Sequence, residues 1–182
     1  MQEELGKRQF YITPGHACSY LAGREARTLF LDPRDTVTPA LYQALSNQGF
    51  RRSGGHLYRP HCETCQACVP TRIPVNDFAP RRSQRRVAAA NRDLDVRGEP
   101  AGFDRRQYEL YARYIAGRHR DGDMYPPSVE QFRSFLLAQW CDTLFVSSYA
   151  GDRLVATAVT DRLPHGLSAV YTYFEPEATD RG

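Results

Sequence analysis

Lysine is almost absent from this 182-residue chain, which contains one Lys, Lys7, beside 23 Arg. The net charge is only +3, so the protein as a whole is not a polycation. Two explanations of the arginine bias stay open at this point. Coding sequences rich in G and C favour Arg, and a guanidinium group also binds phosphate or carboxylate through two parallel hydrogen bonds.

Long apolar runs are also missing. No stretch approaches the ~18 consecutive apolar residues that a membrane-spanning helix needs. The first seven residues are polar and lack the apolar segment of a secretory signal. We therefore expect a cytoplasmic protein with no membrane partner. Thiols stay reduced in the cytoplasm, so the five Cys favour metal binding or chemistry over disulfides.

Three of these Cys lie in one short run at C-x2-C-x2-C spacing, as Cys62, Cys65 and Cys68. This spacing lets a tight loop direct several thiolates at one centre. With the distant Cys18 the chain offers four thiols, the number that tetrahedral zinc or an iron–sulfur cluster requires. The alternative is a loop of unligated Cys that pack as small apolar groups. Cys141, which follows Trp140 on an apolar face, is expected in the core.

A basic run follows the Cys cluster. Its four Arg lie near the start of an expected helix, where backbone amides also face anions. Two further polar residues extend the same surface by about two helical turns. A solvated surface face is the simpler explanation, but the neighbouring Arg favour phosphate binding. The candidate phosphate-binding residues are Arg81, Arg82, Arg85, Arg86, Asn91 and Arg92.

The order of helix and strand signals predicts a mixed fold without internal repeats. Strands are expected on either side of a loop at 15–23, in a hairpin at 50–59, at an edge in 71–75 and at 93–98. Helices are expected at 39–49, from Ser83 to Asn91, from Asp104 to His119, and after Ser128. Three strands at 143–149, 154–161 and 167–174 then form a meander. The last one leaves a sheet edge exposed, so we expect a further helix and strand, about 50–60 residues, beyond Gly182.

Several motifs occur in an order that resembles the aminoacyl-tRNA–protein transferase family of the N-end rule. The closer match is its bacterial branch, the aspartate/glutamate leucyltransferases, and it covers nearly the whole chain. The motifs are Cys18-Ser19-Tyr20-Leu21, Gly49-Phe50-Arg51-Arg52-Ser53-Gly54, Tyr58-Arg59-Pro60 with the Cys cluster, Arg72-Ile73-Pro74-Val75, Ser83-Gln84-Arg85-Arg86, Asn91-Arg92-Asp93-Leu94 and Met124-Tyr125-Pro126-Pro127.

The resemblance implies an enzyme that moves leucine from leucyl-tRNA to the N-terminal amine of proteins that begin with Asp or Glu. This transfer marks those proteins for degradation. It also implies an α+β fold in which residues 101–182 form a GNAT-like acyltransferase sheet, truncated at its C-terminal end. Residues 1–100 then form an N-terminal region that carries the Cys loop and the basic stretch. A monomer is expected.

The donor ester is already activated, so transfer requires no cofactor; whether the Cys cluster binds zinc or an iron–sulfur cluster stays open. Catalytic candidates are Cys18, Ser19 and Tyr20, whose loop would orient the acceptor without a covalent intermediate. Arg24 and Arg27 beside that loop are candidates for binding an acidic acceptor side chain. The basic run would bind tRNA phosphates. His16 and Tyr173 are candidate general bases.

Two departures from the family pattern limit what can be carried over. The eukaryotic arginyl-transferring relatives have C-x2-C in the first motif, where this chain has Leu21 at the second position. Their later Cys pair is adjacent, so a metal ligand set cannot be transferred intact. In addition, Arg181-Gly182 would only begin the phosphate-binding loop of a GNAT fold. The alternatives are a non-catalytic tRNA- or RNA-binding module with a metal knuckle, an arginyl-transferring relative, and a GNAT enzyme that uses acetyl-CoA.

Overall fold

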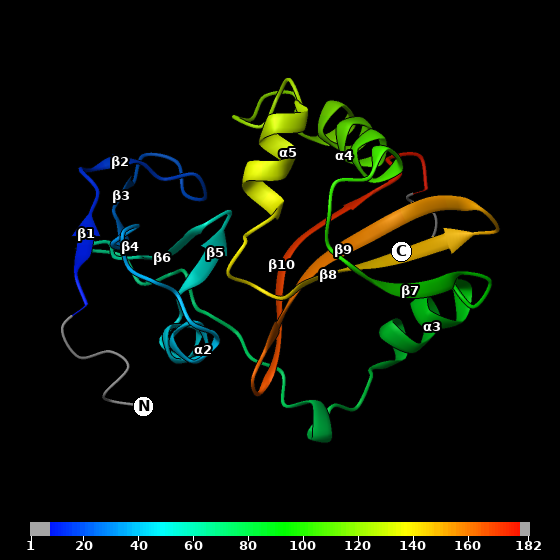
Figure 1. The fold of residues 1–182 in the computed structure, drawn as a ribbon, viewed down its shortest axis with the longest axis horizontal. Helices are drawn as coiled ribbons and strands as arrows, with labels where there is room; N and C mark the ends of the chain where they lie inside the picture. Colours follow the sequence, from blue (N-terminus) through cyan, green and yellow to red (C-terminus); the bar gives the residue numbers. More distant parts are fainter. Residues whose placement is uncertain (1–7, 179–182) are drawn as a thin grey trace.

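The computed structural model describes residues 8–178 and shows a mixed α and β fold with antiparallel sheets. The first sheet has the strand order β1-β4-β6-β5, and a short β2-β3 pair extends from it (Figure 1). The second sheet has the order β10-β9-β8-β7. The strands are β1 Phe10–Ile12, β2 His16–Ala17, β3 Glu25–Ala26, β4 Thr28–Leu31, β5 Arg51–Ser53, β6 His56–Pro60, β7 Asp95–Pro100, β8 Thr143–Ala150, β9 Arg153–Leu163 and β10 Gly166–Phe174.

Three helices begin where a capping side chain predicts them. They are α2 Pro39–Asn47, α4 Arg105–Arg118 and α5 Val129–Leu136. The side chains of Thr38, Asp104 and Ser128 accept hydrogen bonds from backbone amides of the first turn. Such caps satisfy amides that have no partner within the helix. The predictions for these three helices are confirmed.

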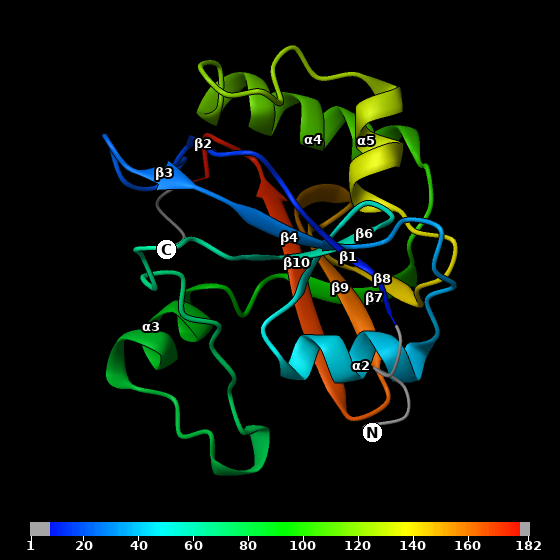
Figure 2. The same cartoon turned by 90° about the vertical axis from the view of Figure 1, so that its left-hand side faces the viewer.

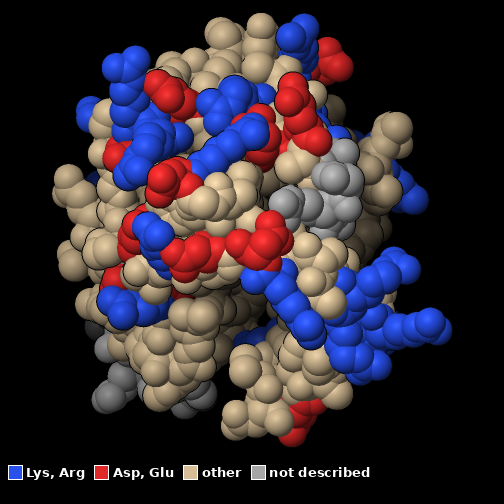
Figure 3. Space-filling view, turned by 90° about the vertical axis from the view of Figure 1, so that its right-hand side faces the viewer, with Lys and Arg blue, Asp and Glu red and all other residues tan. Residues whose placement is uncertain are grey.

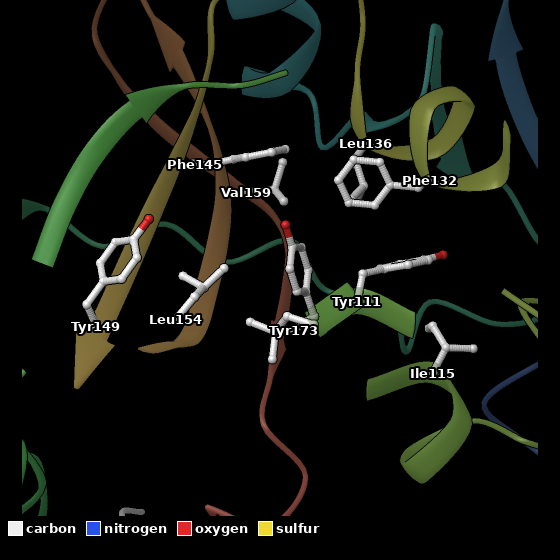
Figure 4. Packing of buried hydrophobic residues seen from close by; sticks show 10 residues of the cluster. Tyr111, Ile115, Phe132, Leu136, Phe145, Tyr149, Leu154, Val159 and Tyr173 are labelled. Carbon is white, nitrogen blue, oxygen red and sulfur yellow. The ribbon is translucent and has the colours of Figure 1, made fainter. Parts of the chain in front are cut away.

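The three-strand meander is also confirmed, as β8, β9 and β10. Alternate residues of β8 are buried, as expected when one face of a sheet covers a core. Helices α4 and α5 lie over this face (Figure 1). Their aromatic side chains interlock with those of the sheet: Tyr111, Phe132 and Tyr173 converge in Figure 4, and each is fully buried. The ring centroids of Tyr111 and Tyr173 lie 5.7 Å apart.

A second core joins the first sheet to the second. Leu41 and Leu45 of α2 pack with Leu57 of β6, and Trp140 and Leu163 close this cluster from the other half of the chain. The β5–β6 turn also approaches α5 closely. The amide of Gly54 donates to the carbonyl of Phe135 at 2.9 Å, and Gly54 has a φ of +55°.

Three predictions of secondary structure need correction. Residues 71–74 form no strand, and a 3-10 turn, η1 Val75–Asp77, follows them. A strand needs a partner, and this exposed segment pairs with no strand among residues 8–178. Helix α3 spans Arg82–Ala90 and begins one residue before Ser83, because Arg81 occupies the capping position. Strand β7 begins two residues later than expected and ends at Pro100.

No helix within residues 8–178 combines the length and the apolar composition needed to cross a membrane.

Candidate functional site

The loop that the sequence singles out, Cys18 to Leu21, lies at the tip of the β2–β3 hairpin. The amide of Cys18 donates to the carbonyl of Arg24 at 2.9 Å and closes the loop. The thiol of Cys18 accepts from the amide of Tyr20 at 3.5 Å. Gly23 turns the chain with a φ of +69°, a conformation that suits glycine. The hairpin thus presents Ser19 and Tyr20 to solvent, and Tyr20 is 73% exposed.

Arg27 joins this hairpin to the Cys loop. Its guanidinium forms ion pairs with Glu63 at 2.8 Å and with Glu25 at 3.5 Å. Its carbonyl accepts from the amide of His61 at 2.8 Å and from the thiol of Cys62 at 3.8 Å. Two segments more than thirty positions apart are therefore held side by side. An acidic ligand at Arg27 would compete with both carboxylates already bound there.

Arg24 offers a more accessible guanidinium. Its backbone closes the hairpin loop, and its side chain is exposed. Within residues 8–178 the ion pairs around this hairpin involve Arg27 and not Arg24. Of the two arginines predicted to bind an acidic side chain, Arg24 is thus the one that needs no rearrangement.

The four thiols expected at a metal centre are not brought together in this structure. In the described part of the chain, no group of three or more His, Cys, Asp or Glu side chains is placed to hold a metal ion. All five Cys are free thiols and half-buried. The physical reason lies in the contacts just described, since the thiol of Cys62 points at a carbonyl and the thiol of Cys18 at its own loop. Ligation of zinc or iron–sulfur by Cys18, Cys62, Cys65 and Cys68 stays a prediction.

Residues 69–94, which we call the basic arm, leave the first sheet and lead to β7. Every residue from 71 to 90 is exposed, so α3 buries no side chain within the described structure. Arginine side chains gather on the protruding lobe at the lower right of Figure 3, where α3 lies. An open pocket of about 550 Å³ lies between η1 and the start of α3. Its lining residues include Arg72, Phe78, Arg81 and Gln84.

The cationic side chains of the basic arm are exposed, and two local contacts order the start of α3. Gln84 accepts from the amide of Arg81 at 2.7 Å and so caps the helix from inside. Arg85 donates to the carbonyl of Pro80 at 2.6 Å. Arg82, Arg86 and Arg92 are exposed. The backbone amide and side-chain amide of Asn91 both donate to the carbonyl of Val87 at the helix end, and its binding of phosphate stays a prediction. The arm can present several guanidinium groups to one polyanion.

Of the two candidate general bases, one is accessible and one is not. His16 is exposed, and its Nδ1 lies 3.3 Å from the carbonyl oxygen of Pro14. Tyr173 is fully buried, and its hydroxyl donates to Gln107 Oε1 at 2.9 Å. Burial raises the pKa of Tyr173 well above its ordinary value. A phenol held protonated in the core, away from solvent, is a poor proton acceptor.

Gln107 is the centre of a buried polar network that the sequence analysis missed. Its Nε2 donates to Ser147 at 2.9 Å, and its Oε1 accepts from Thr157 at 2.8 Å as well as from Tyr173. The four side chains satisfy each other, as buried polar groups must. The signal was available in the sequence, because Ser147 and Thr157 occupy inward-facing positions of predicted strands.

Comparison with known proteins relates this arrangement to a family. Residues 16–86 match the family model of the arginine-tRNA-protein transferase N terminus, and residues 106–182 match that of its C terminus. A protein of Alcanivorax borkumensis named aspartate/glutamate leucyltransferase is 54% identical over 178 residues, which cover 98% of this chain and 74% of that protein.

The chain belongs to the aspartate/glutamate leucyltransferase family. A member from Marinobacter nauticus is 55% identical over 172 residues, which cover 94% of this chain and 73% of the relative. A member from Pseudomonas syringae is 51% identical over 178 residues, with 98% and 76% covered. The first matched region contains the β2–β3 hairpin, the Cys loop and most of the basic arm, and the second contains strands β8 to β10 of the second sheet.

Proposed function

We propose that this protein transfers leucine from leucyl-tRNA to the N-terminal amine of proteins that begin with Asp or Glu. The observation that carries the proposal is the similarity to leucyltransferases across 94–98% of the chain. The exposed basic arm supports it, because a tRNA substrate presents a dense array of phosphates. Its partners are then leucyl-tRNA and acidic N-terminal residues.

The reaction is the attack of the neutral α-amine on the carbonyl carbon of the aminoacyl ester. An amide C–N bond forms, the ester C–O bond to the ribose breaks, and a proton passes from the amine to the released ribose oxygen. No covalent enzyme intermediate is needed. Holding both reactants in place supplies much of the acceleration. Cys18, Ser19 and Tyr20 would orient the acceptor, since their loop is exposed at the hairpin tip.

The binding roles follow from charge and access. Arg24 would bind the acidic side chain of the acceptor, with Arg27 beside it once Glu63 is displaced. Arg81, Arg82, Arg85, Arg86 and Arg92 would bind phosphates along the basic arm, where no carboxylate of the helix competes with them, since α3 contains no acidic residue. A GNAT-like arrangement for the second sheet, the domain division near residue 100, a monomeric state and a cytoplasmic location are parts of the same proposal.

The test is transfer of radiolabelled leucine from charged tRNA to a peptide that begins with Asp. We expect label on the Asp peptide and none on a matched peptide that begins with Ala. Arginyl-tRNA serves as the competing donor, and its preferred use would instead favour an arginyl-transferring relative. Label on neither peptide, with salt-sensitive tRNA binding retained, would support the non-catalytic RNA-binding module.

Matched double variants test the basic arm. Arg85→Gln with Arg86→Gln removes two neighbouring cations from α3, and Arg105→Gln with Arg106→Gln removes two from α4. Each guanidinium that contacts a phosphate contributes close to one released counterion, so the α3 pair should lower the salt dependence of tRNA binding by a slope of roughly 1–2. We expect the α4 pair to leave this slope unchanged. Equal effects of both pairs would contradict a specific role of the arm.

A further inference from the structure

Four side chains form one row across the first sheet. Tyr11 on β1 lies directly opposite Phe30 on β4, and Phe30 lies opposite Tyr58 on β6. Arg51 on β5 is in turn opposite Tyr58. Directly opposed residues of antiparallel strands share a face, so three aromatic rings and a guanidinium cross all four strands side by side. We call these four residues the aromatic row.

The aromatic row lies on the face that does not build the core. Leu31 and Leu57, which point the other way, are only 3% and 1% exposed and pack against α2. Tyr11 is 47% exposed, and Phe30 and Tyr58 are half-buried, with ring centroids 5.6 Å apart in a stacked arrangement. In Figure 2 helix α2 lies below β1, β4 and β6, against the opposite face of this sheet.

Cations flank the aromatic row at both ends. Arg51 ends it on β5, and Arg34 donates to the hydroxyl of Tyr11 at 2.8 Å beyond β1. Two carboxylates near this end are both paired: Asp32 with Arg34, whose hydrogen bonds lower the pKa of Asp32 to about 2, and Asp35 with Arg8 at 3.2 Å. The side chain of Arg34 nevertheless stays 75% exposed. The charge of this face therefore favours an anionic partner with planar apolar groups.

The candidate transfer loop is joined to this sheet by the chain. Strand β3, which closes the hairpin that carries the loop from Cys18 to Leu21, ends at Ala26, and β4 begins at Thr28. The carbonyl of Arg27 between them accepts from the amide of His61, directly after β6, at 2.8 Å. The loop and the aromatic row therefore belong to adjoining elements of the N-terminal half.

We propose that the aromatic row binds the unpaired 3′-terminal nucleotides of the charged tRNA. Every base has a π-face, and aromatic side chains on an open antiparallel sheet stack successive unpaired bases. In the acceptor stem the faces of the paired bases are stacked inside the duplex, so the stem offers mainly phosphates and suits the basic arm. The single-stranded 3′ end offers free base faces and suits the aromatic row. The inference rests on the proposed function, because it assigns the part of leucyl-tRNA that would carry the ester to the Cys18 loop.

The first test measures binding of a fluorescently labelled hexaribonucleotide that ends in CCA, by fluorescence anisotropy. The variants Phe30→Leu and Tyr58→Leu keep apolar bulk but remove a ring. We expect each to weaken binding roughly 5- to 150-fold, the range for losing one base–aromatic stack. Tyr58→Phe, which keeps the ring, should bind like the wild type. A duplex RNA of the same length should be insensitive to all three changes.

The inference is overturned if folded Phe30→Leu and Tyr58→Leu proteins bind the oligonucleotide as tightly as the wild type, or if the wild type does not bind it. Circular dichroism melting establishes which variants are folded. Should a variant fail to fold, crosslinking of wild-type protein to tRNA with a photoreactive 3′-terminal adenosine decides the matter. Crosslinks within residues 10–12, 28–31, 51–53 or 56–60 support the row, and crosslinks elsewhere alone refute it.

Leucine transfer, measured on the same proteins, separates the two proposals. Normal transfer with an unchanged KM for leucyl-tRNA in both ring variants would refute the row and leave the proposed function standing. Absence of transfer by the wild type, with oligonucleotide binding that still depends on the rings, would refute the function and leave the row as a single-strand RNA site.

Discussion

Arg52 on β5 and Asp161 on β9 form a two-pronged ion pair with no solvent exposure of either side chain. The Nε–Oδ2 and Nη2–Oδ1 distances are 2.6 and 2.9 Å. Tyr42 and Thr143 donate to the same carboxylate at 2.8 and 2.7 Å, so every strong acceptor site is used. The pair thereby connects the first sheet to the second across 109 positions of sequence.

Removal of one partner should destabilise the protein strongly. Asp161→Ala leaves the Arg52 guanidinium buried without its counter-charge, which costs about 3–5 kcal/mol of unfolding free energy. Asp95→Ala is the matched control, because its pair with Arg97 is more than half exposed, and such pairs contribute about 0–1 kcal/mol. Urea unfolding measures both, and comparable losses for the two variants would show that burial of the pair is unimportant.

The same pair predicts a pH dependence of stability. Burial opposes ionisation of Asp161, but the hydrogen bonds and charge of Arg52 outweigh it and hold the pKa of Asp161 below the ordinary 3.8. The unfolded chain therefore binds a proton on this group before the folded protein does. The stabilisation is complete above pH 3.8 and is lost as the pH falls through the lower folded pKa. Urea midpoints between pH 6 and 2 should fall at the acid end, and Asp161→Asn should flatten that part of the curve.

Gly54 should tolerate no side chain. Its φ of +55° is left-handed, and a Cβ at this position would collide with the carbonyl oxygen of Ser134. Gly151 has a similar φ of +61°, but nothing lies within 4 Å of its Cβ position. Gly151→Ala should therefore cost only the conformational term of about 1 kcal/mol, and Gly54→Ala should cost clearly more. Thermal melting distinguishes them, and equal losses would rule out the collision as the cause.

Tyr173→Phe separates a structural from a catalytic role. The change removes one hydrogen bond to Gln107, so we expect a loss of about 1 kcal/mol in stability. The rate of leucine transfer should persist, because the pKa of the buried phenol is raised and the group stays protonated. Loss of a general base typically lowers the rate by ~10²–10⁴-fold. A fall of that size in the transfer rate of a folded Tyr173→Phe protein would instead support Tyr173 as the general base.

The parts of the fold that were predictable have local causes. Thr38, Asp104 and Ser128 cap helices a few residues away, and Gly49 and Gly54 mark an end and a turn that the chain itself requires. The meander was recognisable from alternation within each strand. The expected strand at 71–75 was wrong because a strand depends on a partner from elsewhere in the chain. Without a neighbouring strand, the backbone groups of an extended segment form their hydrogen bonds with water instead.

In the candidate site, too, some features could be predicted from the sequence and others only from the structure. The residues of the basic arm and of the Cys18 loop were identified from composition and motif alone, and their roles remain predictions. The pairing of Arg27 with Glu63, which occupies one of the expected binding groups, was not visible from either segment. The aromatic row depends on strand register, which brings Tyr11, Phe30 and Tyr58 together from three separate strands.

The sequence by itself determined the family, the capped helices, the turns and the arginines that are available to bind a phosphate-rich substrate. Each of these features is determined by residues within a short stretch of chain, such as a capping side chain, a glycine or a motif. Only the tertiary structure decided which thiols lie apart, which arginines are already paired and that Arg52 meets Asp161. Those relationships depend on contacts between distant segments, whose energies are set by burial and register and not by local propensity.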